Sequence, residues 1–315
     1  MSFDSSTINS LRIATRKSSL ALWQANEVAN KLKALYPKLN IILVKLVSEG
    51  DKFLETPLTK IGGKALFTKE LERALLSGEA DIAVHSMKDV PAIIPEGLSV
   101  PVICKRENPQ DAFVSNNYKC LDDLPENAVV GTSSLRRQCQ LLALRPDLTI
   151  RFLRGNINTR LNKLDAGLYD AIILATAGLI RLDMRHRITQ ILPPEISLPA
   201  AGQGAMGIEI CSERQDILQL IQPLHDNETA FCVEAERTVS QCLNGSCHVP
   251  LASFSTLKKG ILNLRALIGK PDASVILRAE LSSNVINFKQ TGQSVAKMLI
   301  EQGGQEILSQ YSQNS

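Results

Sequence analysis

The sequence has few aromatic residues and no long apolar run. Aromatics make up 4% of the 315 residues, which is sparse for a protein that binds nucleic acid by stacking bases. The longest nearly apolar run, 171–180, is far shorter than the ~20 residues that a membrane-spanning helix needs. The first ten residues lack the basic start and apolar core of a secretory signal, so we expect a cytoplasmic protein with no membrane partner.

Cysteine and histidine are too scattered to suggest a disulfide framework or a metal site. The seven cysteines and four histidines include no C-x-x-C and no H-E-x-x-H. An odd number of cysteines also leaves at least one of them unpaired. We therefore expect no metal centre, and we expect most cysteines to be small buried side chains.

The charge is nearly balanced over the whole chain but uneven along it. The formal net charge is +3. Between residues 131 and 190, nine arginines and one lysine face only four aspartates, which leaves this stretch at +6 and the rest of the chain at −3. Because a guanidinium holds a carboxylate or phosphate through two parallel hydrogen bonds, the set favours an anion-binding site. Any single arginine is equally consistent with a solvated basic face.

The order of strand and helix patterns predicts an α/β protein with two lobes and a smaller α+β domain at the C-terminus. Strands and amphipathic helices alternate over the first half and again after residue 128, which is typical of a largely parallel sheet. A proline-bounded crossing over 192–204 leads to one more strand, and from Asn227 a helix, antiparallel-looking strands and a final helix follow. We expect lobe 1 to span 1–104 with 205–222, lobe 2 to span 105–204, and the third domain to span 223–315.

Two glycine-rich motifs lack the context that nucleotide binding requires. G-x-G-x-x-G at 202–207 follows a proline-bounded loop and precedes a strand, whereas a dinucleotide site needs a strand before it and a helix after it. Gly62-Gly63-Lys64 lacks the first glycine of a P-loop, and Ala65 replaces its Ser/Thr. Neither motif supports a nucleotide site.

Several segments at predicted strand ends carry stronger signals. Lys88 and Asp89 follow a strand that ends at Val84, and ligands of open α/β sheets bind outside the carboxyl ends of strands. The alternative is a surface ion pair of little energetic weight. Two strand–loop–helix turns combine free backbone N–H groups, hydroxyls and arginines, which together bind anions. The first turn holds Arg16 and Ser18, and the second holds Thr132, Ser133, Ser134, Arg136 and Arg137, with Arg154 and Arg160 further along the chain.

One cysteine and one polar stretch complete the candidates. Cys247 follows Gly245 and Ser246 in a loop, where a thiol is more exposed than in a core and residues carry function more often. The stretch 48–64 is long enough to be a mobile lid.

Taken together, these segments resemble the porphobilinogen deaminase family, also called hydroxymethylbilane synthase. The resemblance runs from Leu11 to about Pro250 and more loosely to the C-terminus. The matching motifs, in chain order, are ATRKSSLA at 14–21, GKALF at 63–67, VHSMKDVP at 84–91, GTSSLRRQ at 131–138, RGNINTR at 154–160, LPAAGQG at 198–204 and GSCHVP at 245–250.

The resemblance implies a monomeric transferase of tetrapyrrole (haem) biosynthesis that joins four porphobilinogen molecules head to tail into hydroxymethylbilane and releases ammonia. It implies two lobes like those of periplasmic binding proteins, and a dipyrromethane cofactor attached through a thioether to Cys247. Asp89 would be the catalytic carboxylate. The other cofactor-binding residues would be Lys88, Thr132, Ser133, Ser134, Arg136, Arg137 and Arg154. The substrate-binding residues would be Arg16, Ser18, Lys60, Lys64, Arg154, Arg160 and Arg181, with Lys60 and Lys64 bordering the lid.

The charge pattern agrees with what the resemblance implies. Porphobilinogen has two carboxylates, so a growing chain accumulates negative charge that arginines can bind. Loss of the aminomethyl nitrogen leaves a cationic azafulvene, which an anionic Asp89 would stabilise and arginines alone would repel. Two other classes stay open. A solute-binding protein would share the lobes but would normally carry an export signal, and a nucleic-acid binder would use the basic stretch despite the low total charge and few aromatics. Only a deaminase predicts a stable adduct on the purified protein.

Overall fold

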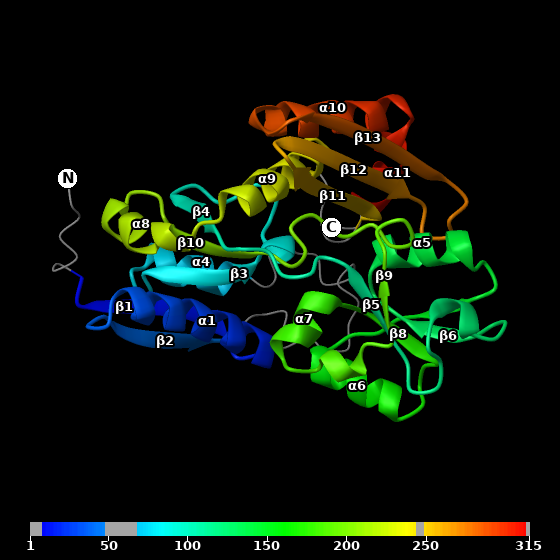
Figure 1. The fold of residues 1–315 in the computed structure, drawn as a ribbon, viewed down its shortest axis with the longest axis horizontal. Helices are drawn as coiled ribbons and strands as arrows, with labels where there is room; N and C mark the ends of the chain where they lie inside the picture. Colours follow the sequence, from blue (N-terminus) through cyan, green and yellow to red (C-terminus); the bar gives the residue numbers. More distant parts are fainter. Residues whose placement is uncertain (1–7, 48–67, 244–248, 313–315) are drawn as a thin grey trace. The chain divides into compact units, whose positions relative to one another are not determined.

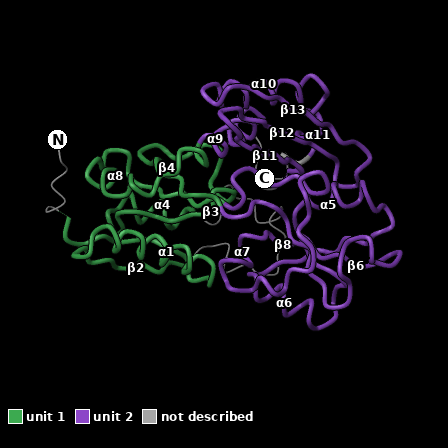
Figure 2. Tube along the Cα trace, in the orientation of Figure 1, with its two compact units in different colours: residues 1–53, 65–106, 205–230 green, residues 54–64, 107–204, 231–315 purple. Residues whose placement is uncertain are grey.

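The computed structural model describes residues 8–47, 68–243 and 249–312. The chain divides into two compact units (Figure 2). Unit 1 takes residues from 1–53, 65–106 and 205–230, and unit 2 takes residues from 54–64, 107–204 and 231–315. The chain therefore leaves the first unit and returns to it before it ends in the second. The three-domain boundaries expected from the sequence stay a prediction.

Unit 1 contains a five-stranded sheet with the strand order β2-β1-β3-β10-β4 (Figure 1). Fully buried Leu11, Ile82 and Ile208 form part of its core with Val28 and Leu32 of the first helix. The strands are β1 (Ser10–Arg16), β2 (Asn40–Leu46), β3 (Ile82–Ser86), β4 (Leu98–Ile103) and β10 (Met206–Cys211). The helices are α1 (Ser19–Leu35), α4 (Lys69–Leu76), α8 (Gln215–Ile221), and the short 3-10 segments η2 (Met87–Asp89) and η5 (Gln222–Leu224).

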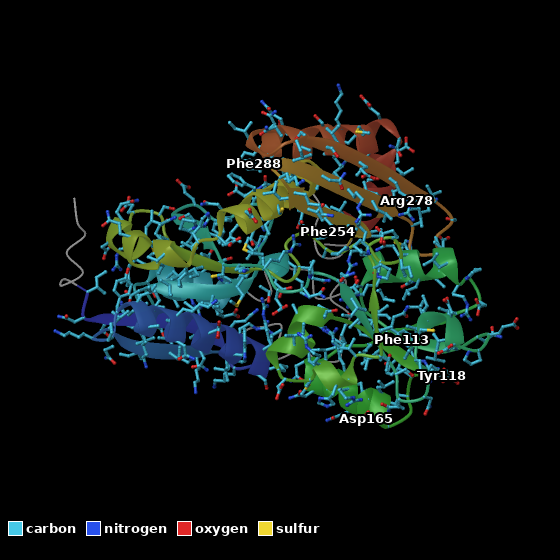
Figure 3. All side chains as sticks on the ribbon, viewed as in Figure 1. Phe113, Tyr118, Asp165, Phe254, Arg278 and Phe288 are labelled. Carbon is cyan, nitrogen blue, oxygen red and sulfur yellow. The ribbon has the colours of Figure 1, made fainter. Side chains whose placement is uncertain are left out.

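Unit 2 contains a second five-stranded sheet, in the order β7-β6-β8-β5-β9. Phe113 on its β5 strand is fully buried and is among the largest such side chains (Figure 3). The strands are β5 (Asp111–Val114), β6 (Val129–Gly131), β7 (Thr149–Arg151), β8 (Ala171–Ala175) and β9 (Gln190–Leu192). The helices are α5 (Leu135–Leu144), α6 (Ile157–Asp165), α7 (Thr176–Arg181), and the 3-10 segments η3 (Leu121–Asp123) and η4 (Arg185–Arg187).

The C-terminal part of unit 2 is a three-stranded antiparallel sheet with helices. Its elements are α9 (Asn227–Cys242), β11 (Leu251–Lys258), β12 (Ile261–Gly269), β13 (Ile276–Asn284), η6 (Val285–Asn287), α10 (Phe288–Glu301) and α11 (Gly304–Ser312). Buried Cys139 of α5 packs with Ala252, Phe254 and Leu267 of this sheet, so the helix α5 shares a hydrophobic cluster with the three-stranded sheet. The predicted fold class, two α/β lobes and a small α+β C-terminal domain, is confirmed.

The expectation of largely parallel sheets is confirmed, because four of the five strands in each five-stranded sheet run in one direction and a single strand runs against them. β1 is parallel to β2 and β3, but β10 is antiparallel to β3 and to β4. In unit 2, β6 is parallel to β7 and β8, while β5 is antiparallel to β8 and β9. A helical crossover makes the strands it joins parallel, but β10 and β5 are not joined to their neighbours by such crossovers, so their direction is not constrained.

Side-chain caps fix where the functional helices begin. The Ser18 hydroxyl accepts the Ala21 N–H at 3.4 Å and starts α1. Ser134 accepts the Arg137 N–H at 3.4 Å and starts α5. Asn156 accepts the Thr159 N–H at 2.9 Å and starts α6. Each cap satisfies a backbone donor that the first helical turn leaves without a partner. In the described part of the chain, no helix combines the length and apolar character needed to cross a membrane.

Candidate active site

In unit 1, four of the predicted residues lie at one edge of the sheet. β1 and β3 are parallel neighbours, with Ala14 paired to Ala83, so their carboxyl ends meet at the same edge. Arg16 is the last residue of β1 and Ser18 caps the next helix, while Lys88 and Asp89 lie in η2, directly after β3. The structure thus brings together the two segments that the sequence singled out separately.

Hydrogen bonds on both sides of β3 fix the start of η2. The Gln24 amide donates to the Ser86 hydroxyl at 2.9 Å, and the Met87 N–H donates to the Ala205 carbonyl at 3.0 Å. One residue before Ser86, His85 Nε2 lies 2.8 Å from Glu209 Oε2, and both side chains are buried. These contacts hold β3 against α1 and β10 and so set where the backbone of Lys88 and Asp89 lies.

Asp89 is half-buried at this edge. Among the residues that the structure describes, none donates a hydrogen bond or forms an ion pair with its carboxylate. A carboxylate in such a position can accept the N–H of a bound molecule or offset a nearby positive charge.

In unit 2, the predicted residues also collect at the carboxyl ends of parallel strands. Thr132, Ser133 and Ser134 follow β6, and the α5 arginines come next in the chain. Arg154 follows β7, which is parallel to β6, and Arg181 ends the helix that follows β8. Because β5 is antiparallel to β8, with Asp111 paired to Ala175, the first residue of β5 lies at this same edge.

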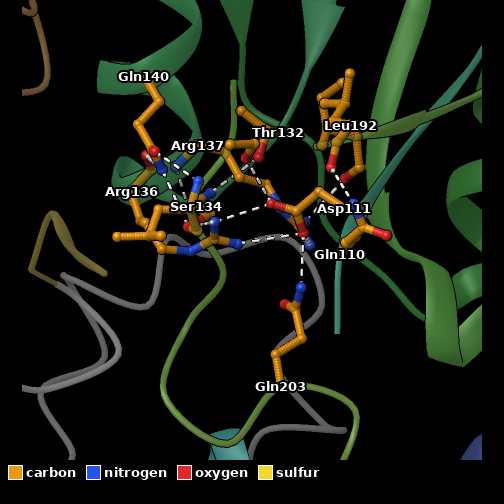
Figure 4. A network of polar contacts seen from close by, with 12 residues as sticks. Gln110, Asp111, Thr132, Ser134, Arg136, Arg137, Gln140, Leu192 and Gln203 are labelled. Atoms are coloured by element: carbon orange, nitrogen blue, oxygen red, sulfur yellow. Dashed lines mark hydrogen bonds and ion pairs between the residues drawn. The ribbon is translucent and has the colours of Figure 1, made fainter. Parts of the chain in front are cut away.

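Asp111 binds both arginines at the start of α5 (Figure 4). Arg136 donates through Nη1 to Oδ2 at 2.9 Å and through Nη2 to Oδ1 at 3.3 Å, and Arg137 donates through Nη2 to Oδ1 at 2.7 Å. All three side chains are buried. The sequence analysis set only four aspartates against the arginine-rich stretch. That account was incomplete, because the carboxylate that neutralises the pair comes from residue 111, outside the stretch.

Arg154 is in the opposite situation. It is 6% exposed, and its Nη1 and Nη2 atoms are buried without a hydrogen-bond partner in the described structure. Burial lowers the pKa of its guanidinium from the usual value. Burying a cation without a partner is costly, so this guanidinium is suited to an anionic group that none of the described residues provides.

Two further predicted arginines donate to backbone carbonyls. Arg160 Nε donates to the Gly155 carbonyl at 2.8 Å, and the buried Arg181 donates through Nη2 to the Gly204 carbonyl at 2.7 Å. Lys60, Lys64 and Cys247 lie outside the described residues. Among the described cysteines, Cys139 is buried, which raises its pKa to about 11 and makes it a poor thiolate.

Sequence reasoning missed Asp111 and the His85–Glu209 pair. Asp111 opens a short apolar strand, Asp111-Ala-Phe-Val, two residues after Pro109, and that pattern was the available signal. No pattern in the sequence pairs His85 with Glu209, which are 124 residues apart and meet only because β10 lies beside β3.

The residues present fit a ligand that carries several carboxylates. The uncompensated charge of Arg154 and the hydroxyls of Thr132, Ser133 and Ser134 lie at one edge of the unit 2 sheet. Helix starts such as that of α5 add partial positive charge. In unit 1, the Asp89 carboxylate, which has no partner among the described residues, follows Lys88 at the carboxyl end of β3.

Comparison with known proteins gives two family matches that together cover most of the chain. Residues 11–219 match the model described as porphobilinogen deaminase, dipyromethane cofactor binding domain, and residues 230–301 match the porphobilinogen deaminase C-terminal domain.

Similar solved structures include several proteins of other kinds. The periplasmic aliphatic sulphonate binding protein SsuA from Escherichia coli is 13% identical, with 94% of this chain and 88% of that chain covered and a TM-score of 0.43. The regulatory domain of OxyR2 from Vibrio vulnificus is 16% identical, with 71% and 97% covered and a TM-score of 0.43. A YaeC-family lipoprotein from Enterococcus faecalis is 16% identical, with 70% and 93% covered and a TM-score of 0.42. At these scores the similarities carry no argument about the ligand.

Proposed function

The chain belongs to the porphobilinogen deaminase family, and we propose that it joins four porphobilinogen molecules head to tail into hydroxymethylbilane with release of ammonia. The family matches confirm the resemblance that the motifs indicated, and they support a transferase of porphyrin and haem biosynthesis that uses dipyrromethane. The finer reaction, the thioether to Cys247, a monomeric state and a cytoplasmic location are parts of this proposal.

The observation that carries the proposal is the buried, unpartnered guanidinium of Arg154. A folded protein normally pairs a buried cation, because removal from water is costly and the partner offsets that cost. Because no described residue supplies that partner, we infer that the offsetting group is an anion from outside the chain. Porphobilinogen and the products of its condensation carry carboxylates that can supply this anion. A neutral substrate could not supply it.

A dipyrromethane held at Cys247 would supply the pyrrole carbon to which the first substrate unit is joined. Toward it, the residues at the unit 2 sheet edge would act as binding groups. Arg154 and the hydroxyls of Thr132, Ser133 and Ser134 would hold its acetate and propionate groups, together with Arg136, Arg137 and Lys88. Arg16, Ser18, Lys60, Lys64, Arg160 and Arg181 would bind the carboxylates of the incoming substrate.

Asp89 would serve the chemical step itself. As the aminomethyl nitrogen leaves the substrate, positive charge develops on the pyrrole, and a fixed carboxylate close to the pyrrole N–H stabilises that charge. The same carboxylate can accept and return a proton. Because no described residue binds it, its charge is available for these roles.

The experiment is ammonia release from porphobilinogen by Asp89→Asn loaded with preformed cofactor. The amide keeps the size of the side chain and can still accept an N–H, but it removes the charge. Electrostatic stabilisation of this kind is worth ~3–4 kcal/mol and proton transfer adds 10²–10⁴-fold, so we expect turnover to fall by several orders of magnitude with the fold intact.

Asp122→Asn is the matched control, because Asp122 is an exposed aspartate on η3. Its turnover should equal that of the parent. Turnover of Asp89→Asn within about tenfold of the parent would remove Asp89 from the mechanism, since it would leave no room for either effect.

A further inference from the structure

A single carboxylate organises the start of α5. Besides both arginines, Asp111 accepts the Ser197 hydroxyl at 2.8 Å through Oδ2 and the Gln203 amide at 2.9 Å through Oδ1. Asp111 is fully buried, and Ser197 and Gln203 are 1% exposed. Every donor around this carboxylate is therefore fixed both by burial among its neighbours and by its hydrogen bond. The side chains of the cluster are thus held in a single conformation.

The cluster carries a net charge of +1. Burial alone would raise the pKa of Asp111, but attraction to Arg136 and Arg137 and their hydrogen bonds hold it well below its usual range. The two arginines thus favour the ionised form of Asp111. One negative charge faces two positive charges in a buried site, so one unit of positive charge remains uncompensated by the carboxylate.

Further contacts orient the two guanidinium groups. Arg136 Nη1 also donates to the Leu198 carbonyl at 2.6 Å, and Arg137 Nη1 donates to the Ile173 carbonyl at 2.9 Å. The Nε of Arg137 is buried without a partner. The arginines are thus fixed before any ligand arrives, which lowers the entropy cost of binding.

We propose that Asp111 is a positioning residue for carboxylate binding: it holds Arg136 and Arg137 in their binding orientation and cancels one of their two charges. The pair then offers a single net positive charge to one ligand carboxylate. This inference rests on the proposed function. The alternative is that Asp111 only stabilises the fold and that the arginines bind by charge alone.

Asp111→Asn separates the two accounts, with Asp147→Asn as the matched control. Asp147 also pairs with an arginine of unit 2, Arg145 Nη2 at 2.6 Å, but at the surface. Both variants raise the net charge by one, so charge alone predicts equal or tighter binding of an anionic substrate in both. Positioning predicts the reverse for Asp111→Asn. We expect its cofactor occupancy by intact mass to fall about tenfold and its KM for porphobilinogen to rise about tenfold, with a smaller change in kcat. Asp147→Asn should match the parent.

A folded Asp111→Asn protein with occupancy and KM within about twofold of the parent overturns the inference. If circular dichroism shows that this variant is unfolded, the double variant Ser197→Ala/Gln203→Leu replaces it, because it keeps the charge of Asp111 and removes its two neutral donors. We expect reduced occupancy and a raised KM there too, and parental values overturn the inference. A parent protein that carries no adduct and releases no ammonia refutes the proposed function instead.

Discussion

At the scale of single residues, arginines of one sheet edge differ in what compensates their charge. Arg136 and Arg137 share a buried carboxylate, whereas Arg154 is buried and has no hydrogen-bond partner for Nη1 and Nη2 among the residues that the structure describes. Protein stability and ligand binding therefore place opposite demands on Arg154. A buried guanidinium that destabilises the free protein is retained where it binds an anionic group of the ligand.

Arg154→Met in a Cys247→Ser background tests this conflict in protein without cofactor. The substitution keeps an apolar stem of similar length and removes the buried donors. We expect the free energy of unfolding to rise by about 1–3 kcal/mol, which is the cost of leaving buried polar groups unsatisfied. Denaturant titration measures it. With Cys247 intact, the same substitution should lower cofactor occupancy.

Arg151→Met is the control, because Arg151 is exposed and lies three residues earlier in the same stretch. Its unfolding free energy should change by no more than about 0.5 kcal/mol. A loss of stability in Arg154→Met would mean that the guanidinium already has a partner within the chain, against our account.

The sequence predicted the residue types at this edge but not their pairing. Arginine-rich composition and strand-end positions identified Arg136, Arg137 and Arg154 as a set. Which of them is neutralised depends on Asp111, and that contact exists only because β5 runs antiparallel to β8. Strand direction is a property of the folded sheet, and four residues of strand carry no signal for it.

At the scale of elements, a turn with unusual backbone geometry places Arg154. Gly155 has φ +117°, a conformation that side chains rarely adopt, and a Cβ there would lie 2.7 Å from Thr159 Cγ2. Thr159 is fixed in turn by Asn156, which caps α6. Backbone strain and a close contact therefore both require glycine between β7 and α6.

Gly155→Ala should displace this turn and Arg154 with it. We expect it to destabilise the protein by about 1–3 kcal/mol through strain and to lower cofactor occupancy. Denaturant titration and intact mass measure the two effects.

Gly167→Ala is the matched control. Gly167 also has a positive φ, +72°, but a Cβ there meets nothing within 4 Å. Gly167→Ala should lower the free energy of unfolding by about 1–2 kcal/mol, because alanine is strained in a left-handed backbone conformation, and it should leave cofactor occupancy unchanged. Equal losses of occupancy in both variants would show that stability, and not the position of Arg154, limits cofactor loading.

At the scale of the whole molecule, the order of elements was predictable and the packing between distant segments was not. Alternating strands and helices predicted both α/β lobes, and the change of pattern after Asn227 predicted the α+β part. The short strands β5 and β9 were not predicted. The cluster of Cys139 with Phe254, which joins α5 to the three-stranded sheet, depends on contacts between distant segments, which no local pattern reports.

The most direct test of the central claim is the intact mass of the purified protein, compared with Cys247→Ser and with Cys242→Ser. Cys242 is an exposed thiol at the end of α9 and serves as the control. We predict that the parent and Cys242→Ser carry the added mass of two deaminated porphobilinogen units and release ammonia from porphobilinogen, while Cys247→Ser is unmodified and inactive. An active enzyme with unmodified Cys247, or an adduct located on Cys242, would contradict the account.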